Sequence, residues 1–229
     1  MNHASLFSGI GGFDLAAEWM GWNNVFNCEW EEFPRQVLKH HFPNAIQHGD
    51  IKELDATAYA GRIDILTGGF PCQPYSAAGK RKGKDDERHL WPEMLRVVQE
   101  CAPRYVVGEN VFGLVNWNRG MVFEEVCSDL EAEGYAVQSY VLPAASVNAP
   151  HRRDRVFFVA ADTQRLRLEH TQESGSVGQC KGKARRYIAN SSETIGSVQP
   201  IADTKMPRGK RQCVKKSRQV LKHHFPNAS

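Results

Sequence analysis

Short runs of β-branched and aromatic residues alternate, in the first part of the chain, with stretches whose apolar residues recur at helical spacing. The runs that predict strands cover residues 4–7, 25–29, 64–69, 105–109, 135–142 and 155–160. The stretches that predict helices are FDLAAEWMGW, PRQVLKHHF, LWPEMLRVVQE and VFEEVCSDLEAEG. This alternation is typical of βαβ units, so we expect an α/β fold with a doubly wound, mostly parallel sheet and helices on both faces.

The alternating pattern ends after Ala161, and the residues beyond it are rich in Ser, Gly, Gln and Lys. Only Tyr187 and Phe225 are aromatic beyond residue 159, so this part has little material for a packed core. We therefore expect a folded domain over residues 1–161 and a basic, poorly structured region over residues 162–229.

The net charge of +3 hides an asymmetry between these two parts. Residues 160–229 carry 14 Lys and Arg against 5 Asp and Glu, whereas residues 1–159 carry 15 against 21. A basic tail of this kind suits loose contact with nucleic acid phosphates. No run of eighteen apolar residues and no basic-then-apolar N-terminus occurs, which predicts a cytoplasmic protein without a membrane partner.

One segment of the sequence is repeated without change. RQVLKHHFPNA occupies residues 35–45 and returns at residues 218–228. The second copy has no predicted strand beside it on which a helix would pack. Recombination, a frameshift or a truncated reading frame explains the copy better than a function does.

The six cysteines lie at positions 28, 72, 101, 127, 180 and 213. No CxxC pair occurs, and the irregular spacing predicts neither a zinc site nor a disulfide framework, so no metal is expected. The cysteines at 28, 101 and 127 lie in apolar runs, which is typical of small buried side chains. Cys72 differs, because it follows a strand and stands between Pro71 and Pro74, which keep it out of a helix. It is the candidate nucleophile.

The segment ASLFSGIGGF predicts a strand that ends in a glycine-rich turn at the start of a helix. Backbone in such a turn can approach a nucleotide closely. Gly9, Gly11 and Gly12 do not complete a GxGxxG fingerprint, because Phe13 and Asp14 follow. Taken alone, the turn is explained equally well as an ordinary tight turn.

Acidic residues follow the next two predicted strands. Glu29 stands eighteen residues beyond Gly11, where a carboxylate can accept hydrogen bonds from both hydroxyls of a ribose. Trp30 and Ile51 can cover the two faces of an adenine, and Asp50, in HGDI, can accept from its amino group. Helix N-caps are the alternative for Glu29 and Asp50, and each residue alone fits that alternative better. The ordered set favours a nucleotide site.

A second polar group is expected at the same edge of the sheet. Glu109, in YVVGENV, ends a strand, and burial there raises the pKa of a carboxyl toward neutrality, so that it can hand over a proton. Arg153 and Arg155 stand at alternate positions entering the last strand, so both point to one side. A solvated basic edge is the alternative for an arginine pair, and Arg152 fits that description.

These pieces, in this order, resemble the DNA cytosine C5 methyltransferases. The matching motifs are FSGIGGF, EW, GD, PCQ, ENV and the arginine pair before RVFFVA, which together span residues 4 to about 160. The resemblance implies a Rossmann-like, class I methyltransferase domain over residues 1–161, with S-adenosyl-L-methionine as cofactor and double-stranded DNA as partner. The implied cofactor site consists of Phe7, Gly9, Gly11, Gly12, Glu29, Trp30, Asp50, Ile51 and Pro71.

The resemblance also implies a reaction. Cys72, as a thiolate, attacks C6 of a cytosine flipped out of the duplex, and C5 then takes the methyl group. Glu109, protonated, neutralises the ring at N3 and the exocyclic amine. Arg155 donates to the cytosine O2, and Arg153 favours the thiolate form of Cys72.

The segment from Pro74 to His89 is expected to close over DNA, as the corresponding segment does in the family. Its cations suit phosphate contact, although a merely exposed basic loop is the alternative. They are Lys80, Arg81, Lys82, Lys84 and Arg88.

The chain departs from the family pattern after the arginine strand. Complete members continue into a recognition domain and a glycine-asparagine segment that completes the cofactor pocket, and no Gly-Asn dipeptide occurs here. Residues 162–229 would be the remnant of the recognition region. Three interpretations stay open: a methyltransferase, alone or completed by a second chain that supplies the recognition region; a truncated, inactive member that binds nucleic acid through its basic tail; and an RNA methyltransferase of the same fold. A role in restriction and modification also follows from the family.

Overall fold

The computed structural model describes residues 1–71, 90–165 and 199–200 of the 229-residue chain. Several sequence expectations fall on residues outside this description. They concern Cys72, the basic loop from Pro74 to His89, the second RQVLKHHFPNA copy and nearly all of the region 162–229.

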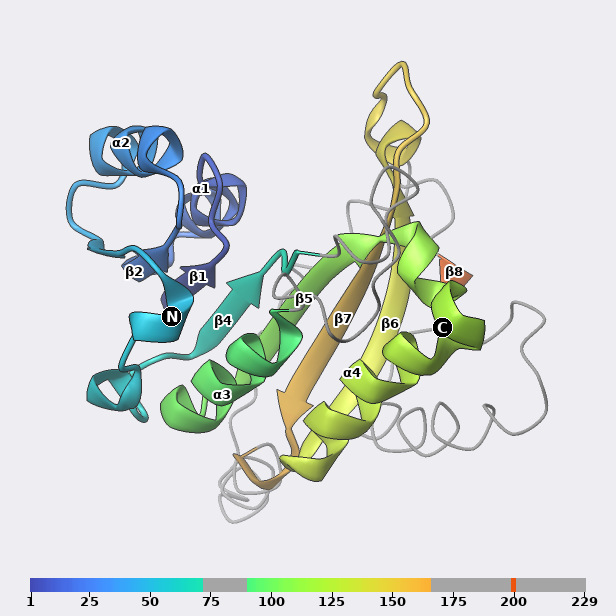
Figure 1. Cartoon of the computed structure of the whole chain (residues 1–229). Coiled ribbons are helices and arrows are strands. Elements are labelled where there is room, and N and C mark those ends of the chain that lie inside the picture. Colours follow the sequence, from blue (N-terminus) through green and yellow to red (C-terminus); the bar gives the residue numbers. More distant parts are fainter. Residues whose placement is uncertain (72–89, 166–198, 201–229) are drawn as a thin grey trace, which may run out of the picture.

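The strands in the described parts of the chain form one eight-stranded sheet in the order β3-β2-β1-β4-β5-β7-β6-β8 (Figure 1). From β3 to β5 all neighbours are parallel, whereas β7 runs antiparallel to both β5 and β6, and β8 antiparallel to β6. The predicted α/β, doubly wound sheet is confirmed. Its antiparallel part consists of β7, β6 and β8. The strands are β1 (Asn2–Leu6), β2 (Asn23–Cys28), β3 (Ile46–His48), β4 (Ile65–Gly68), β5 (Tyr105–Val111), β6 (Tyr135–Pro143), β7 (Asp154–Asp162) and β8 (Gln199–Pro200).

All four predicted helices are present. They are α1 (Gly12–Trp19), α2 (Glu32–His41), α3 (Trp91–Cys101) and α4 (Met121–Ala132). Single 3-10 turns join the elements, and one of them, η1 (Ile51–Glu53), directly follows Asp50. None of the helices described is long and apolar enough to span a bilayer.

The main core lies between the sheet and the pair α3 and α4. Met94 of α3 packs so tightly on Gly68 that a Cβ added there would lie 3.0 Å from the methionine sulfur. Aromatic rings continue this layer, with centroids 5.2 Å apart for Phe70 and Trp91 and 5.4 Å apart for Phe123 and Phe158. This face is therefore closed by large apolar side chains.

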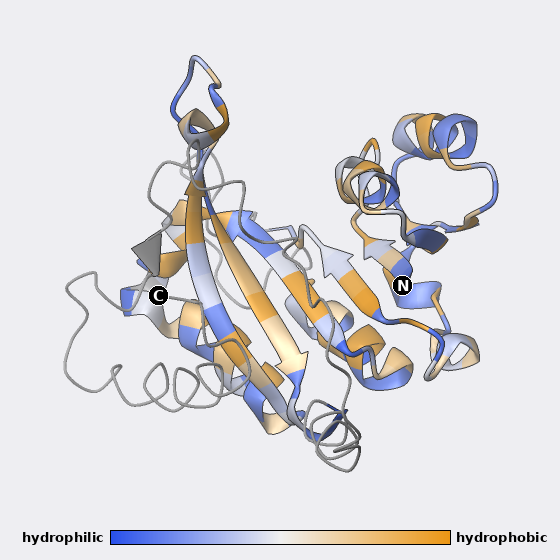
Figure 2. Ribbon diagram, turned by 180° about the vertical axis from the view of Figure 1, so that it is seen from behind, coloured by the Kyte–Doolittle hydropathy of each residue, from blue (hydrophilic) through white to orange (hydrophobic). Residues whose placement is uncertain are grey.

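The helices α1 and α2 lie on the opposite face, over the N-terminal strands. Asp14 of α1 reaches the Ser5 hydroxyl of β1, whereas the neighbouring Leu6 belongs to the core under α3. Figure 2 shows β4, β5 and β7 from this side, with no described helix in front of them. Helices thus cover both faces, as predicted, but different strands on each.

The strand order reverses between β1 and β4, because β2 and β3 extend from one side of this pair and β5 from the other. In open α/β sheets, ligands bind outside the carboxyl ends of the strands at such a switch point. Leu6 pairs with both Cys28 and Gly68, so the ends of three strands lie level there. The residues that follow these ends are those predicted to form the site.

We expect Trp91→Phe to destabilise the fold by about 2–4 kcal/mol, because the change leaves a void and removes a hydrogen-bond donor. The Trp91 indole is 1% exposed and donates to the Asp129 carboxylate at 2.8 Å. Urea unfolding followed by circular dichroism measures the change, with an unaltered m-value. The matched control is Trp19→Phe, since Trp19 is 78% exposed. Equal effects of the two changes would contradict the assignment of Trp91 to the core.

Candidate active site

The glycine turn between β1 and α1 depends on backbone conformations that favour glycine. Gly9 has a φ of 55° and Gly11 a φ of 88°, both left-handed. A Cβ on Gly11 would lie 2.5 Å from the Phe42 ring, so α2 packs directly on the turn. Phe7, at the start of the turn, is also left-handed, with a φ of 51°. The turn is held in a shape that larger residues at Gly11 would not permit.

Glu29 connects the end of β2 to the glycine turn. One carboxylate oxygen accepts from the Gly9 amide at 2.7 Å, and the other accepts from the Glu31 amide at 2.9 Å. The N-cap position of α2 is occupied by Glu31, and no side chain caps it. Glu29 is therefore not the cap residue of α2, and its carboxylate lies where the turn and the strand end meet.

Trp30 follows Glu29 directly and Asp50 follows β3, and the two differ in how they are engaged. The Trp30 side chain is 71% exposed, so its indole face is open to a ligand. Asp50 accepts from the Lys52 amide at 3.0 Å and caps η1, as the cap alternative predicted. Ile51 is only 4% exposed and belongs to the core, which leaves little of its surface for a base.

Glu109 and Arg155 form an ion pair at the end of β5, with Nε of Arg155 2.8 Å from a Glu109 oxygen. The antiparallel register brings them together, because Arg155 lies opposite Val111, two residues beyond Glu109. Burial raises the pKa of Glu109, and the charges of Arg155 and Arg153 oppose that rise. The predicted direction of the shift is confirmed.

The two other arginines before β7 are exposed. The charge of Arg153 acts on Glu109, although its side chain points into solvent. Arg152 is 88% exposed and pairs with Asp154 at 3.0 Å, which agrees with a solvated basic edge. The described arginine in direct contact with Glu109 is therefore Arg155.

Asn110 fixes the chain that leaves β4 toward Cys72. Its side-chain amide donates to the Phe70 carbonyl at 3.0 Å, and its oxygen accepts from the Val111 amide at 2.8 Å. A Cβ on Gly69 would lie 3.3 Å from a Glu109 oxygen, so this segment passes directly beside the acid. In the sequence, Asn110 was identified only as part of the ENV motif, and no contact was predicted for its side chain.

The other described cysteines agree with their interpretation as buried side chains. Cys28, Cys101 and Cys127 are buried free thiols. Burial raises the pKa of Cys28 and of Cys101 to about 12, so neither forms a thiolate at neutral pH. Cys72, the predicted nucleophile, lies outside the described residues.

A buried polar group beneath the glycine turn was not predicted. The Ser5 hydroxyl contacts both Asp14 carboxylate oxygens, at 3.0 and 2.9 Å, and the Ser8 hydroxyl at 2.7 Å. Burial raises the pKa of Asp14 to about 6. On the same strand, buried His3 contacts Asn24 and Thr67, and burial lowers its pKa to about 4. A single polar residue inside an apolar run does not indicate which side chain it contacts, so the sequence did not predict these contacts.

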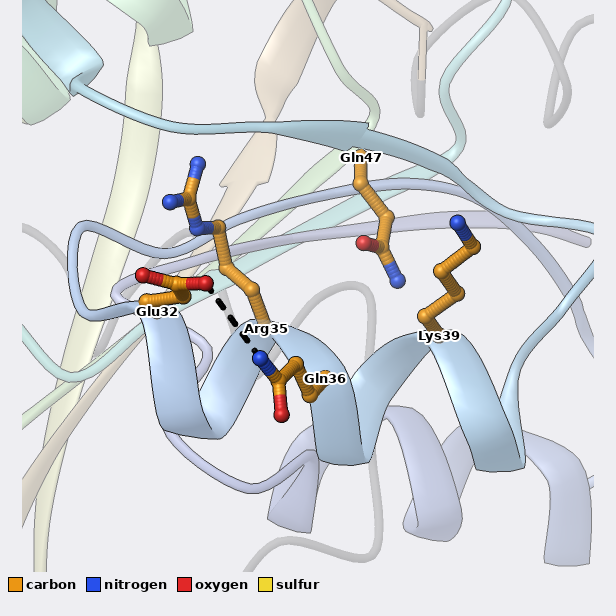
Figure 3. Close-up of a pocket in the computed structure, with 5 residues that line it drawn as sticks. All are labelled: Glu32, Arg35, Gln36, Lys39 and Gln47. Carbon is orange, nitrogen blue, oxygen red and sulfur yellow. Dashed lines mark hydrogen bonds between the residues drawn. The ribbon is translucent and has the colours of Figure 1, made fainter.

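A pocket of about 270 Å³ lies between α2 and β3, at the edge of the sheet (Figure 3). None of the predicted site residues lines it. A Cβ on Gly49 would lie 3.1 Å from the Arg35 guanidinium, so the pocket backs onto the chain before Asp50. Within the described ranges, no cluster of three metal-ligating side chains occurs. The lining residues are Glu32, Arg35, Gln36, Lys39 and Gln47.

Comparisons with known proteins identify relatives of this chain. The family model of the C-5 cytosine-specific DNA methylases matches residues 1–227. The chain is 37% identical to the type II methyltransferase M.NgoBI of Neisseria gonorrhoeae, over 67% of the chain and 48% of that relative. It is 34% identical to M.HhaI of Haemophilus parahaemolyticus, over 67% of the chain and 47% of the relative. For M.AquIA of Picosynechococcus, the identity is 36%, over 68% of the chain and 69% of the relative.

Solved structures give the same result. A putative DNA modification methyltransferase encoded within an E. coli prophage has a TM-score of 0.61 and 26% identity, covering 72% of this chain and 47% of that one. The Dnmt2 methyltransferase of S. pombe shares the fold, with a TM-score of 0.58, 22% identity and coverage of 81% and 59%. The chain spans less than half the length of M.NgoBI and M.HhaI.

We expect the pKa of Glu109 to appear in the pH dependence of stability. Its pKa is raised on folding, so the stability it contributes is fully present below its ordinary pKa of 4.5 and is lost as the pH rises through the raised value. The Glu109→Gln variant has no titrating group at this position. Its free energy of unfolding should therefore increase relative to that of the wild type as the pH rises above about 4.5. Urea unfolding across a pH series measures the difference.

Arg155→Met provides the matched comparison for this prediction. Without the guanidinium, the pKa of Glu109 should rise further, and the pH-dependent loss of stability should become steeper than in the wild type. A difference between Glu109→Gln and the wild type that stays constant across the series would contradict the raised pKa.

Proposed function

The chain belongs to the C-5 cytosine-specific DNA methylase family, and from this premise we propose that it transfers a methyl group to C5 of cytosine in double-stranded DNA. The observation that carries the proposal is the pair of Glu109 and Arg155 beside the Gly69–Pro71 segment, at the carboxyl edge that also holds the glycine turn. A partly buried acid and a guanidinium, beside the segment that precedes Cys72 in the sequence, suit attack on a pyrimidine ring.

Members of this family use S-adenosylmethionine as the methyl donor, and the residues at the glycine turn fit it. Glu29 offers carboxylate oxygens at the turn, Trp30 an open indole face, and Asp50 a carboxylate that a single backbone amide engages. When bound there, the cofactor supplies an electrophilic methyl group. We propose that it is held by Phe7, Gly9, Gly11, Gly12, Glu29, Trp30, Asp50, Ile51 and Pro71.

The reaction proposed for this chain uses Cys72 as nucleophile. The thiolate forms a bond to C6 of a flipped cytosine, while Glu109 gives its proton to N3. The ring carbon C5 would then take the methyl group, leaving S-adenosylhomocysteine, and lose its proton to a base. N3 returns its proton to Glu109, and the bond between C6 and sulfur breaks to release the Cys72 thiolate. The raised pKa of Glu109 favours the protonated acid that these reaction steps need.

The arginines would stabilise charge on the ring and on the thiol. Arg155 uses Nε for Glu109 and one terminal nitrogen for the Asp154 carbonyl at 3.0 Å, which leaves guanidinium donors for the cytosine O2. Arg153, exposed and close enough to act on Glu109, would favour the thiolate of Cys72. The proposed catalytic set is Cys72, Glu109, Arg153 and Arg155, without a metal.

We propose residues 1–161 as the catalytic domain and residues 162–229 as a remnant of the target-recognition region. Strand β7 ends at Asp162, one residue beyond the proposed boundary. With DNA as substrate, the chain would act in the cytoplasm. A role in restriction and modification is proposed from the type II relatives.

We also propose that a second chain completes the site. Large apolar side chains lie exposed around α1: Ile10 at 68%, Leu15 at 41%, Trp19 at 78% and Met20 at 64%. Large apolar side chains that are exposed together often mark an interaction surface. It adjoins the glycine turn, so a recognition chain packed here would also close the cofactor pocket.

Methyl transfer tests the function. Labelled methyl should pass from S-adenosylmethionine to mixed-sequence duplex DNA, and Cys72→Ser should reduce the rate by a factor of roughly 100 or more, because the covalent route is lost. Duplex DNA with 5-fluorocytosine should form a covalent complex with the wild type only, since fluorine blocks loss of the C5 substituent. Label on tRNA with none on DNA would contradict the DNA substrate and support the RNA alternative.

Reconstitution tests the second chain. We expect methyl transfer to rise when the product of the reading frame downstream of this gene is added, provided that frame encodes a Gly-Asn segment. Trp19→Glu should abolish the rise, whereas Met121→Glu, at a side chain 56% exposed on α4, should leave it unchanged. No label with or without the added chain, together with salt-sensitive DNA binding, would support the inactive alternative.

A further inference from the structure

Arg96 of α3 binds the turn that follows Asp50. Its guanidinium donates to the Ile51 carbonyl at 2.6 Å and to the Leu54 carbonyl at 2.9 Å. Ile51 begins the η1 turn and Leu54 is its C-cap, and both lie more than forty residues away from Arg96 in the sequence. One side chain of the main helix layer therefore spans the whole turn.

Two acids on the same helix hold Arg96 in place. Glu93 accepts from its Nε at 2.9 Å, and Glu100 accepts from a terminal nitrogen at 2.6 Å. The second Glu100 oxygen accepts from the Ala56 amide at 2.9 Å, just beyond the turn. We refer to Glu93, Arg96 and Glu100 as the Arg96 clamp. Charge-assisted bonds of this kind are shorter and stronger than neutral ones.

The turn held by the Arg96 clamp has little support from the sheet. It follows β3, an edge strand of three residues that pairs only with β2 among the strands described. Asp50 stands between β3 and η1, and among the described residues its carboxylate accepts a hydrogen bond from the Lys52 amide inside the same turn. The position of the Asp50 carboxylate therefore depends on two supports, which are the bonds from the end of β2 to the His48 and Gly49 carbonyls and the attachment of the turn to α3.

We propose that Arg96 is a positioning residue that sets Asp50 for recognition of the adenine amino group and so determines the base selectivity of cofactor binding. The inference rests on the proposed function, which places adenine beside Asp50. Arg96 itself touches neither base nor methyl group. It acts through the Ile51 and Leu54 carbonyls, and Glu100 adds the Ala56 amide.

The experiment compares two ligands by isothermal titration calorimetry on the full chain. S-adenosylhomocysteine carries the adenine amino group, and S-inosylhomocysteine carries a carbonyl in its place. The wild type should prefer the first by about tenfold or more, since the wrong group leaves the Asp50 acceptor unpaired. Arg96→Met should weaken adenosyl binding by about tenfold and bring the ratio of the two affinities close to one.

Two further variants make the result specific. Arg96→Lys keeps one donor and should give an intermediate ratio, which also carries the test should Arg96→Met not fold. Arg62→Met is the matched control, because Arg62 is exposed and lies over the Tyr59 ring at 5.9 Å. It should leave the ratio unchanged.

The outcomes separate the two proposals. A ratio that stays at the wild-type value in Arg96→Met and Arg96→Lys, even with both affinities reduced, would overturn the positioning role alone, because general loosening weakens both ligands equally. Failure of the wild type to bind either ligand would overturn the cofactor proposal and this inference together. A ratio that falls in the Arg96 variants and holds in Arg62→Met would support the inference.

Discussion

A carboxylate that is largely removed from water needs a neighbour that supplies charge or hydrogen bonds, and for the partly buried Glu109 that neighbour is Arg155. The two residues are 46 positions apart in the sequence and meet because β7 returns antiparallel beside β5. A parallel strand at this place would have carried Arg155 to the other end of the sheet. The antiparallel insertion of β7 is thus the constraint on which the arrangement of the polar edge depends.

Most of the fold followed from periodicity, because long amphipathic segments and buried strands carry strong patterns. All four helices and the alternation of strands were predicted, whereas the boundary expected near residue 161 stays a prediction. The direction of β7 was not, since hydrophobic alternation does not distinguish parallel from antiparallel neighbours. Residues brought together by strand ends, such as Glu29 and Gly9, were therefore easier to predict than those joined across β5 and β7.

Two of the residues that sequence reasoning missed, Asn110 and Arg96, share one kind of contact. Asn110 binds the Phe70 carbonyl, and Arg96 binds the Ile51 carbonyl, each from a side chain to distant backbone. Every residue type has the same backbone carbonyl. The sequence around residues 51 and 70 therefore does not indicate which side chain donates to it. At Asp50 two interpretations from sequence both have a physical basis, because one carboxylate can cap η1 and still accept from a ligand.

His3 of β1 and Asp14 of α1, both buried, have opposite effects on stability in acid. His3 is held neutral, so the folded state loses stability as the pH falls from 6.5 toward its lowered pKa of about 4. Asp14 takes up its proton more readily when folded, so stability is gained as the pH falls through about 6 toward the ordinary value of 3.8. Over their shared interval one loss offsets the other gain. Mild acidification should therefore change the free energy of unfolding less through this pair than through either residue alone.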